Sequence, residues 1–197
     1  MSRAAGILMP ITSLPGKYGI GCFSKEAYAF IDWLKEAGQT YWQILPIHPT
    51  SYGDSPYQSF STFAGNPYFI DLEELIEEGM LTREECDSMD FGDDEDDIDY
   101  EDQYQNRYIL LTMAYERSNI SQNPDYQRFV EENRWWLDDY ALFMALKNFF
   151  KGQCWNEWPQ DIRLRWGYPW TITAVSCIST SNSRCSCSFT SSGSTGD

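Results

Sequence analysis

Residues 41–67 read YWQILPIHPTSYGDSPYQSFSTFAGNP, a short apolar run followed by a long loop. The run at 41–45 has the length and composition of a strand, whereas the residues after it show neither helical nor strand periodicity. Glycine and proline restrict the backbone of the loop, at Gly53, Pro56, Gly65 and Pro67. A long ordered loop that leaves a strand is a common position for binding residues, so this stretch is the first candidate for a functional site.

The residues before this loop predict a strand, a helix and then the strand at 41–45. Residues 5–9 form the first apolar run, and Ser24 to Gly38 read as an amphipathic helix with Ser24 as its N-cap. This order is typical of a parallel sheet. We therefore expect an α/β fold, the N-terminal part of a (β/α)8 (TIM) barrel. Its active-site loops, at 10–21 and 46–67, would leave the carboxyl ends of the strands.

The pattern changes to helices after residue 70. Helices are predicted at 71–79, about 102–118 and 125–150. The second helix would place four side chains on one face, namely Tyr104, Tyr108, Leu111 and Tyr115. Because a barrel has no room for such helices inside its wall, we expect a mostly helical insertion at 71–165, after the first barrel elements at 1–70.

The side chains of the long loop suit a sugar. Its aromatic residues offer flat faces on which pyranose rings stack, and they are Tyr52, Tyr57, Phe60 and Phe63. Its neutral hydrogen-bonding groups suit sugar hydroxyls, and they include Ser55, Gln58 and Asn66. The alternative is an ordered surface loop whose aromatic side chains only anchor it to the core.

Charge and hydropathy exclude several classes of partner. The 197 residues have a formal net charge of −16, which repels nucleic acid phosphates and anionic membrane surfaces. The first apolar stretch is interrupted by Pro10 and makes a poor signal peptide, and later stretches fall short of the roughly 20 apolar residues that span a bilayer. We therefore expect a cytoplasmic protein without nucleic acid or membrane partners.

Cysteine and acidic residues do not predict a metal site. Cys22, Cys86 and Cys154 are far apart in the sequence and are expected to be free thiols. The Cys185-Ser186-Cys187 segment lacks a nearby histidine, so zinc is not expected there. The acidic run at 90–102 does not have the spacing of a calcium loop and is expected to be a solvated connection.

Four stretches of the sequence resemble one enzyme family. Residues 54–67 resemble the signature of the amylomaltases, the 4-α-glucanotransferases that are also called disproportionating enzymes. Residues 3–21 resemble the opening strand and loop of that family, and residues 42–46 resemble its second strand. Residues 130–165 also resemble family sequence. The resemblance therefore covers about 3–165, in the expected order.

The resemblance implies that a segment of a 1,4-α-glucan is transferred to the 4-hydroxyl of another glucan or of glucose, with retained configuration. Retention needs two carboxyl groups about 5 Å apart, and in the family both lie on later barrel strands, downstream of Arg165. The chain is therefore expected to be a truncated fragment with no catalytic residues and no cofactor or metal. Ser55 and Tyr57 match donor-sugar contacts of the family, and Tyr52 is a candidate glucan contact. The implied partners are α-1,4-glucans and maltooligosaccharides.

Three other polar residues of the loop are given structural roles or none. The carboxylate of Asp54 is expected to accept hydrogen bonds that hold the turn, and Asn66 is expected to fasten the loop before Pro67. His48 is the only histidine of the chain and is assigned no role.

The composition changes abruptly after Arg165. Residues 171–197 are almost wholly serine, threonine, cysteine and glycine, which predicts a disordered tail. The alternative that we favour is a shift of the reading frame near Tyr168, because the codons of the tail are compatible in another frame with further family sequence. The expected tail spans 166–197.

Two further hypotheses remain open besides the transferase. In the first, the chain is a noncatalytic carbohydrate-binding remnant. In the second, it is a structural helical module without a sugar site. Codons for the catalytic carboxylates downstream would favour the enzyme over the carbohydrate-binding remnant. In either case two strands of a barrel leave sheet edges and faces uncovered, so the isolated chain is expected to be marginally stable or to aggregate.

Overall fold

The computed structural model describes residues 3–51, 53–92 and 97–165, without the side chains of residues 164 and 165. Tyr52 and the expected tail at 166–197 lie outside the described residues. Two compact units divide the chain, the first comprising Met1–Ile47 and Gly65–Asn133 and the second His48–Ala64 and Arg134–Asp197. We refer to them below as unit 1 and unit 2.

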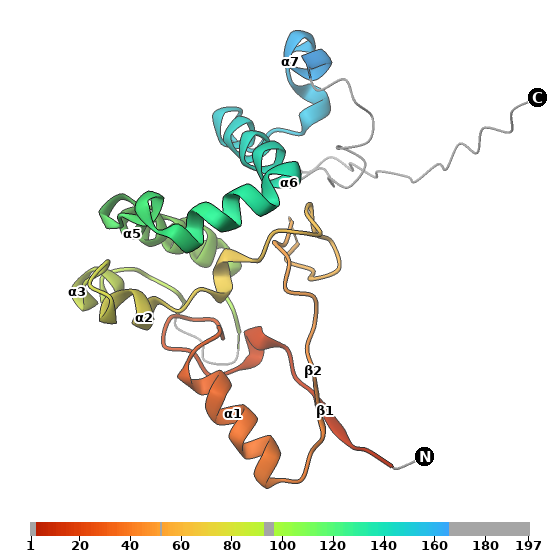
Figure 1. Cartoon of the computed structure of the whole chain (residues 1–197), viewed down its shortest axis with the longest axis vertical. Coiled ribbons are helices and arrows are strands. Elements are labelled where there is room, and N and C mark those ends of the chain that lie inside the picture. The colour runs from red at the N-terminus through yellow and green to blue at the C-terminus, as the bar shows by residue number, and fades with distance from the viewer. Residues whose placement is uncertain (1–2, 52, 93–96, 166–197) are drawn as a thin grey trace, which may run out of the picture. The chain divides into compact units, whose positions relative to one another are not determined.

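A parallel pair of strands opens unit 1 (Figure 1). Strand β1 spans Gly6–Leu8 and pairs with β2, Tyr41–Gln43, in a register that places Ile7 beside Trp42. The helix α1, Lys25–Glu36, connects the two strands, so the predicted order of strand, helix and strand is confirmed. Leu8 and Tyr41 remain 58% and 65% exposed. These exposed strand residues do not test the expected marginal stability of the isolated chain, which stays a prediction.

The first core of unit 1 lies between α1 and the turns that follow β1. Ala27 of α1 is buried with three other residues, Ile11, Leu14 and Phe69. Phe30 packs edge-on against Trp42 with ring centroids 5.0 Å apart. Ser24 precedes α1 as predicted, but its hydroxyl donates to Glu26 at 2.5 Å instead of capping the helix. The helix is therefore held mainly by its apolar face.

The second core of unit 1 lies among short helices. They are α2 Leu72–Glu77, α3 Arg83–Asp87, α4 Tyr100–Asp102 and α5 Tyr108–Arg117. Leu72, Cys86 and Leu110 are completely buried there. Asp71 caps α2 by accepting from the amide of Glu73 at 2.9 Å. Short 3-10 helices add single turns, at Ile11–Ser13, Pro67–Phe69, Ile120–Gln122 and Trp155–Glu157.

The helix predicted at 102–118 differs from the observed structure. A π-turn, Gln103–Arg107, separates α4 from α5. The predicted tyrosine face is not the buried one, because Tyr104 and Tyr115 are 59% and 64% exposed. The buried side chains of this segment are Gln103, Arg107, Leu110 and Ala114. The apolar pattern missed this face because two of its four members are polar.

The longest helix is α6, Pro124–Phe149, within one residue of its predicted bounds, and α7 follows at Gln160–Arg165. In unit 2, Phe143 of α6 packs against Trp158 with ring centroids 5.6 Å apart. The ammonium group of Lys147 donates to the carbonyl groups of Gly152 and Gln153, at 2.5 and 2.8 Å. A buried cation thus satisfies carbonyl groups just beyond the C-terminal end of α6.

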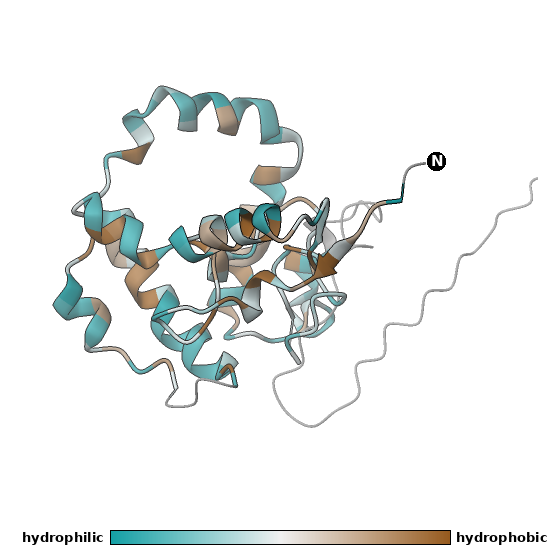
Figure 2. Ribbon diagram, turned by 90° about the horizontal axis from the view of Figure 1, so that it is seen from below, coloured by the Kyte–Doolittle hydropathy of each residue, from teal (hydrophilic) through white to brown (hydrophobic). Residues whose placement is uncertain are grey.

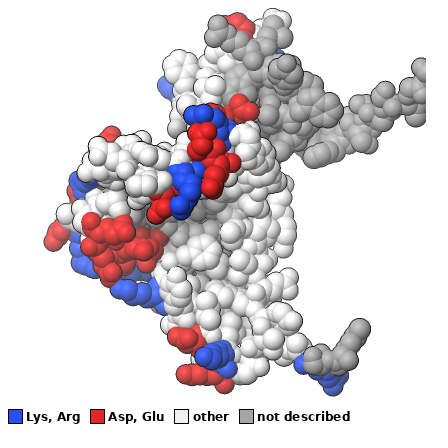
Figure 3. Space-filling model, viewed as in Figure 1, with Lys and Arg blue, Asp and Glu red and all other residues white. Residues whose placement is uncertain are grey.

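Hydrophilic residues interrupt the hydrophobic ones along the helices (Figure 2). Within the described residues, every helix is too short or too polar to span a bilayer. In the same part of the chain, Cys22, Cys86 and Cys154 form no disulfide bond, as predicted, and all three are buried. The Cys185-Ser186-Cys187 segment lies outside the described residues. On the face shown in Figure 3, basic side chains lie beside acidic ones. The ion pairs of the structure include Lys17 with Asp87, 2.7 Å apart.

Candidate functional site

The long loop His48–Ala64 belongs to unit 2, and backbone contacts close its base. The ring of His48 lies 3.3 Å, by its Nδ1 atom, from the carbonyl oxygen of Ala64. Thr50 and Ser59 form an antiparallel bridge. The carbonyl oxygen of Gln58 accepts from both the amide and the hydroxyl of Ser51, at 3.1 and 2.7 Å. The loop is therefore an ordered element with its ends held together.

The tip of the loop is a tight turn around the predicted site residues. The amide of Asp54 donates to the Ser51 carbonyl at 3.0 Å, and the Gln58 amide donates to the Ser55 carbonyl at 3.0 Å. Asp54 has a φ of 54°, a conformation that aspartate tolerates better than most residues. Burial raises the pKa of its carboxyl group. We expected the carboxylate of Asp54 to accept the hydrogen bonds that hold the turn. The hydrogen bond observed at Asp54 is instead donated by its backbone amide.

Ser55 and Tyr57 are adjacent at this tip. The Ser55 hydroxyl oxygen accepts from the amide of Tyr57 at 3.4 Å, and Ser55 is half-buried. The Tyr57 side chain is 74% exposed. Tyr52, the third predicted contact, lies outside the described residues. The loop tip therefore combines an exposed aromatic ring with a hydroxyl group two residues earlier that is held by the backbone, two groups that suit the face and the hydroxyls of a sugar.

Buried serine side chains hold the second half of the loop. The Ser61 hydroxyl oxygen accepts from the amides of Phe63 and Ala64, at 3.3 and 3.1 Å. In unit 1, Asn66 accepts from the amide of Tyr68 at 3.0 Å, which confirms its predicted fastening role. Such local side-chain bonds to the backbone are typical of turns. They explain why this stretch needs so many serine and asparagine residues.

Aromatic residues of the loop pack on the second half of α6, a contact that sequence reasoning missed. Phe60 is buried and stacks on Tyr140, with ring centroids 6.3 Å apart and an interplanar angle of 6°. Phe63 contacts Trp135 edge-on at 4.8 Å and Trp136 at 5.7 Å. Two of the loop aromatics therefore anchor it, as the structural alternative required, whereas Tyr57 extends into solvent. The aromatic residues within 135–140 are the sequence feature that could have indicated this contact.

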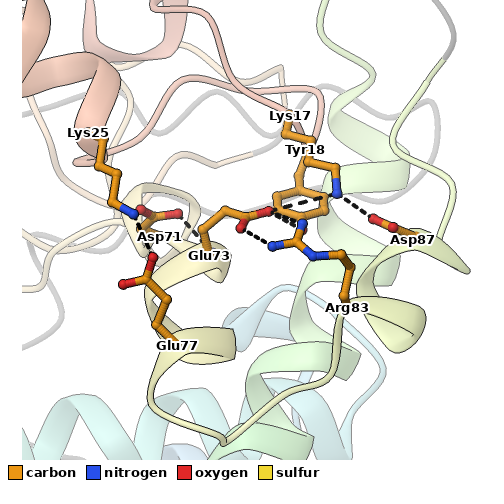
Figure 4. Close-up of polar contacts among 8 residues, drawn as sticks. All are labelled: Lys17, Tyr18, Lys25, Asp71, Glu73, Glu77, Arg83 and Asp87. Carbon is orange, nitrogen blue, oxygen red and sulfur yellow. Dashed lines mark hydrogen bonds and ion pairs between the residues drawn. The ribbon is translucent and has the colours of Figure 1, made fainter.

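The other candidate loop, Pro10–Gly21 in unit 1, is held by a polar cluster (Figure 4). The Tyr18 hydroxyl donates to Glu73 at 2.7 Å, and Arg83 donates to both carboxylate oxygens of Glu73, at 2.8 and 2.6 Å. Lys17 lies 3.8 Å from Glu73 and 2.7 Å from Asp87. The loop is therefore tied to α2 and α3 through one shared carboxylate.

This cluster changes the titration of its members. The bonds from Arg83, and then from Tyr18, hold the pKa of Glu73 at about 2, below its usual 4.5. Burial first, and then the bond to Glu73, raises the pKa of Tyr18. On the neighbouring surface, Arg117 of α5 similarly lowers the pKa of Glu85 to about 2 through paired bonds of 2.8 and 2.6 Å. Carboxylates thus link the loop, α2, α3 and α5 while ionised.

The lowered pKa of Glu73 predicts a pH-dependent contribution to stability. A carboxyl group with a depressed folded-state pKa stabilises above its unfolded pKa, and this contribution is lost as the pH falls from about 4.5 through about 2. We expect Glu73→Gln to cost roughly 1 kcal/mol at neutral pH, a value discounted for solvent screening. Urea unfolding followed by circular dichroism at several pH values measures both effects.

The exposed carboxylate of Glu84, on the same surface but outside the cluster, is the matched control. Glu84→Gln is expected to leave the acid dependence of the urea midpoint close to that of the wild type. Equal acid dependence in Glu73→Gln and the wild type would contradict the assigned role of Glu73.

Metal-binding chemistry finds no support in this part of the chain. Among the described residues, histidine, cysteine, aspartate and glutamate side chains do not gather in threes around a position that would hold a metal ion. In the acidic connection, Asp90 accepts from the amide of Gly92 and Asp99 from that of Asp102, both at 3.0 Å. These carboxylates are engaged in local turns and a helix cap.

Comparisons with known proteins identify the family of the chain. The family model described as 4-alpha-glucanotransferase matches residues 9–176. A 4-alpha-glucanotransferase of Clostridium butyricum is 52% identical over 157 residues, which are 80% of this chain and 32% of that protein. One of Thermus thermophilus is 47% identical over 169 residues, 84% of this chain and 33% of the relative.

A solved structure gives the same result. The amylomaltase from Streptococcus agalactiae in complex with acarbose matches with a TM-score of 0.76 and 42% identity, over 83% of this chain and 33% of that one. The chain belongs to the 4-alpha-glucanotransferase family. It spans about a third of the length of the curated relatives that it matches.

Proposed function

We propose that this chain is the substrate-positioning part of a 4-α-glucanotransferase. The enzyme would transfer a segment of a 1,4-α-glucan to the 4-hydroxyl of another glucan or of glucose. The observation that carries the proposal is the tip of the long loop, where the Tyr57 ring is exposed and the hydroxyl of the half-buried Ser55 accepts from the Tyr57 amide. Tyr52 is proposed as a third contact on the same loop.

The loop is already ordered without a bound ligand. Its base is closed by the paired bonds of Ser51 to Gln58, and its aromatic anchors on α6 keep it in place. A preformed loop binds with less loss of conformational freedom than a mobile one. A rigid turn with one exposed ring and neutral polar neighbours suits the apolar face and hydroxyl groups of a pyranose.

The fold supports a barrel with a helical insertion. The parallel pair of β1 and β2 joined by α1 is the unit from which β/α barrels are built, and exposed strand residues leave room for neighbouring strands. We propose that residues 1–70 contribute the first barrel elements and that 71–165 form the helical insertion. The tail at 166–197 is proposed to be frameshifted or disordered.

The catalytic carboxyl groups are proposed to be absent from residues 3–165. A retaining mechanism needs a nucleophile and an acid/base about 5 Å apart across the glycosidic bond. Asp54, the acidic residue of the loop tip, has a positive φ, and we assign it to the backbone conformation of the turn and not to catalysis. The chain would then bind glucan without cleaving it. Its proposed partners are α-1,4-glucans and maltooligosaccharides, and its proposed location is the cytoplasm.

Calorimetric titration of the purified chain with maltoheptaose tests the proposed function. We expect saturable binding, and Tyr57→Ala should weaken it about tenfold, because truncating an aromatic contact in a binding site costs on the order of 1 kcal/mol or more. Cellopentaose, with β-linkages, should bind more weakly than maltoheptaose.

The matched control is Tyr28→Ala on α1, since the Tyr28 side chain is 70% exposed and lies outside the loop. Its affinity for maltoheptaose should equal that of the wild type. The proposal fails if the folded wild-type chain shows no binding, or if both tyrosine variants lose affinity equally.

A further inference from the structure

Gln103 and Arg107 are buried polar side chains that the proposed function does not use. Their exposed fractions are 0% and 1%, although both side chains are long and one carries a charge. They occupy the first and last positions of the π-turn Gln103–Arg107 between α4 and α5. Single π-turns inside helices are frequent at functional sites.

The two side chains form a hydrogen-bonded relay between separate segments of unit 1. Arg107 donates to the carbonyl oxygen of Ile70 at 2.6 Å and to the side-chain oxygen of Gln103 at 3.3 Å. Gln103 in turn donates to the carbonyl oxygen of Tyr18 at 2.6 Å. The pair therefore fixes the backbone of the Pro10–Gly21 loop and the backbone just before α2.

The loop is shaped to receive this contact. At Gly19, the residue after Tyr18, φ is +72°, and a Cβ atom there would lie 2.8 Å from the Gln103 amide nitrogen. The hydroxyl group of Tyr18 is held at the same time by Glu73 (Figure 4). Tyr18 is thus fixed at its backbone and at its ring, from two different elements.

Burying the charged side chain of Arg107 between two segments costs desolvation free energy. Burial lowers the pKa of Arg107, and its Nε atom has no hydrogen-bond partner among the described residues. In that part of the chain, Arg107 donates to a backbone carbonyl and to an amide oxygen, neither of which carries a charge. A buried polar pair of this kind is weak evidence for added stability, and in some proteins such groups serve to select one conformation.

We propose that Gln103 and Arg107 are positioning residues that hold the Pro10–Gly21 loop in the conformation that binds glucan. The proposal rests on the proposed function and on the expectation that this loop, which follows β1, is one of the two active-site loops of the barrel. The pair acts through the backbone of Tyr18 and makes no contact with the sugar itself.

Hydrogen exchange of the full chain, followed by mass spectrometry, tests the positioning role. The loop reporters are the amides of Gly21 and Phe23, which donate to Thr12 and Phe69. We expect Arg107→Met and Gln103→Met to speed exchange at these amides at least tenfold, whereas peptides from α5 exchange as in the wild type. Arg107→Lys keeps a donor and should restore most of the protection.

Gln105→Met is the matched control, because Gln105 lies in the same π-turn but is exposed and bonds to Glu101. It should leave the loop reporters unchanged. Unchanged loop exchange in Arg107→Met and Gln103→Met, or equal acceleration in the loop and in α5, would overturn the positioning role. The second outcome would leave the pair with a purely structural role.

Titration with maltoheptaose separates this inference from the proposed function. If both hold, the wild type binds and the two methionine variants bind more weakly in proportion to loop opening. If the loop opens selectively but the wild type does not bind, the proposed function fails and the glucan part of the inference fails with it. If the variants open the loop and still bind like the wild type, only the positioning inference fails.

Discussion

Gly19→Ala is expected to unfold unit 1 in the isolated chain. The substitution forces alanine into a φ of +72° and brings its Cβ atom within 2.3 Å of the Phe91 carbonyl oxygen. The left-handed conformation costs about 1–2 kcal/mol, and a steric overlap in a packed region costs about 1–3 kcal/mol more. A total of roughly 3 kcal/mol is a large part of the stability of a small domain. Circular dichroism with urea titration measures the loss.

Gly38→Ala separates the two contributions. Gly38 follows α1 with nearly the same φ, +70°, but no atom lies within 4 Å of a Cβ atom placed there. This variant should lose about 1–2 kcal/mol and keep a folded baseline. Equal losses in the two variants would show that the contact of Gly19 with Phe91 has no energetic importance, and that the loop is not packed as described.

The strands and the main helices were predictable because their apolar spacing is regular. The run at 41–45 contains β2, and the helix at 24–38 contains α1, since tertiary packing there follows the amphipathic pattern. The buried face of the π-turn and α5 was not predictable, because Gln103 and Arg107 of the π-turn are buried together with Leu110 of α5. Burial of polar groups depends on partners that are distant in the sequence, here Tyr18 and Ile70.

The candidate site was predictable in composition but not in construction. Glycine, proline and hydroxyl residues indicated an ordered loop, and Ser61 and Asn66 do hold its turns. The different roles of the aromatic residues could be assigned only from the structure, since Phe60 is buried against α6 and Tyr57 is exposed. The separate helix α3 was missed, although Thr82 and Glu85 form a capping box that the sequence displays.

Tyr57→Ala should abolish most transfer activity in an enzyme that depends on this loop. The host is a chimera in which residues 9–165 replace the matching segment of the Clostridium butyricum relative, which is 52% identical. A side chain that orients the donor sugar acts on the transition state, so its loss lowers kcat/KM. We expect a decrease on the order of 100-fold, about 2.7 kcal/mol of transition-state stabilisation. Glucose release from maltotriose measures the rate.

Two companion variants of the chimera identify the source of the effect. Tyr57→Phe keeps the ring and removes the hydroxyl, so it should retain most activity if stacking dominates. Tyr28→Ala, with a similarly exposed ring outside the loop, should match the parent chimera. A Tyr57→Ala chimera with unchanged kcat/KM and an unchanged melting temperature would remove Tyr57 from the proposed site.

Transfer activity of the unmodified chimera tests the central claim most directly. If this chain is the substrate-positioning part of a 4-α-glucanotransferase, the chimera should convert maltotriose to glucose and longer maltooligosaccharides at a rate within about tenfold of the parent enzyme. A chimera that folds with the parent's melting temperature but transfers no glucan would contradict the account.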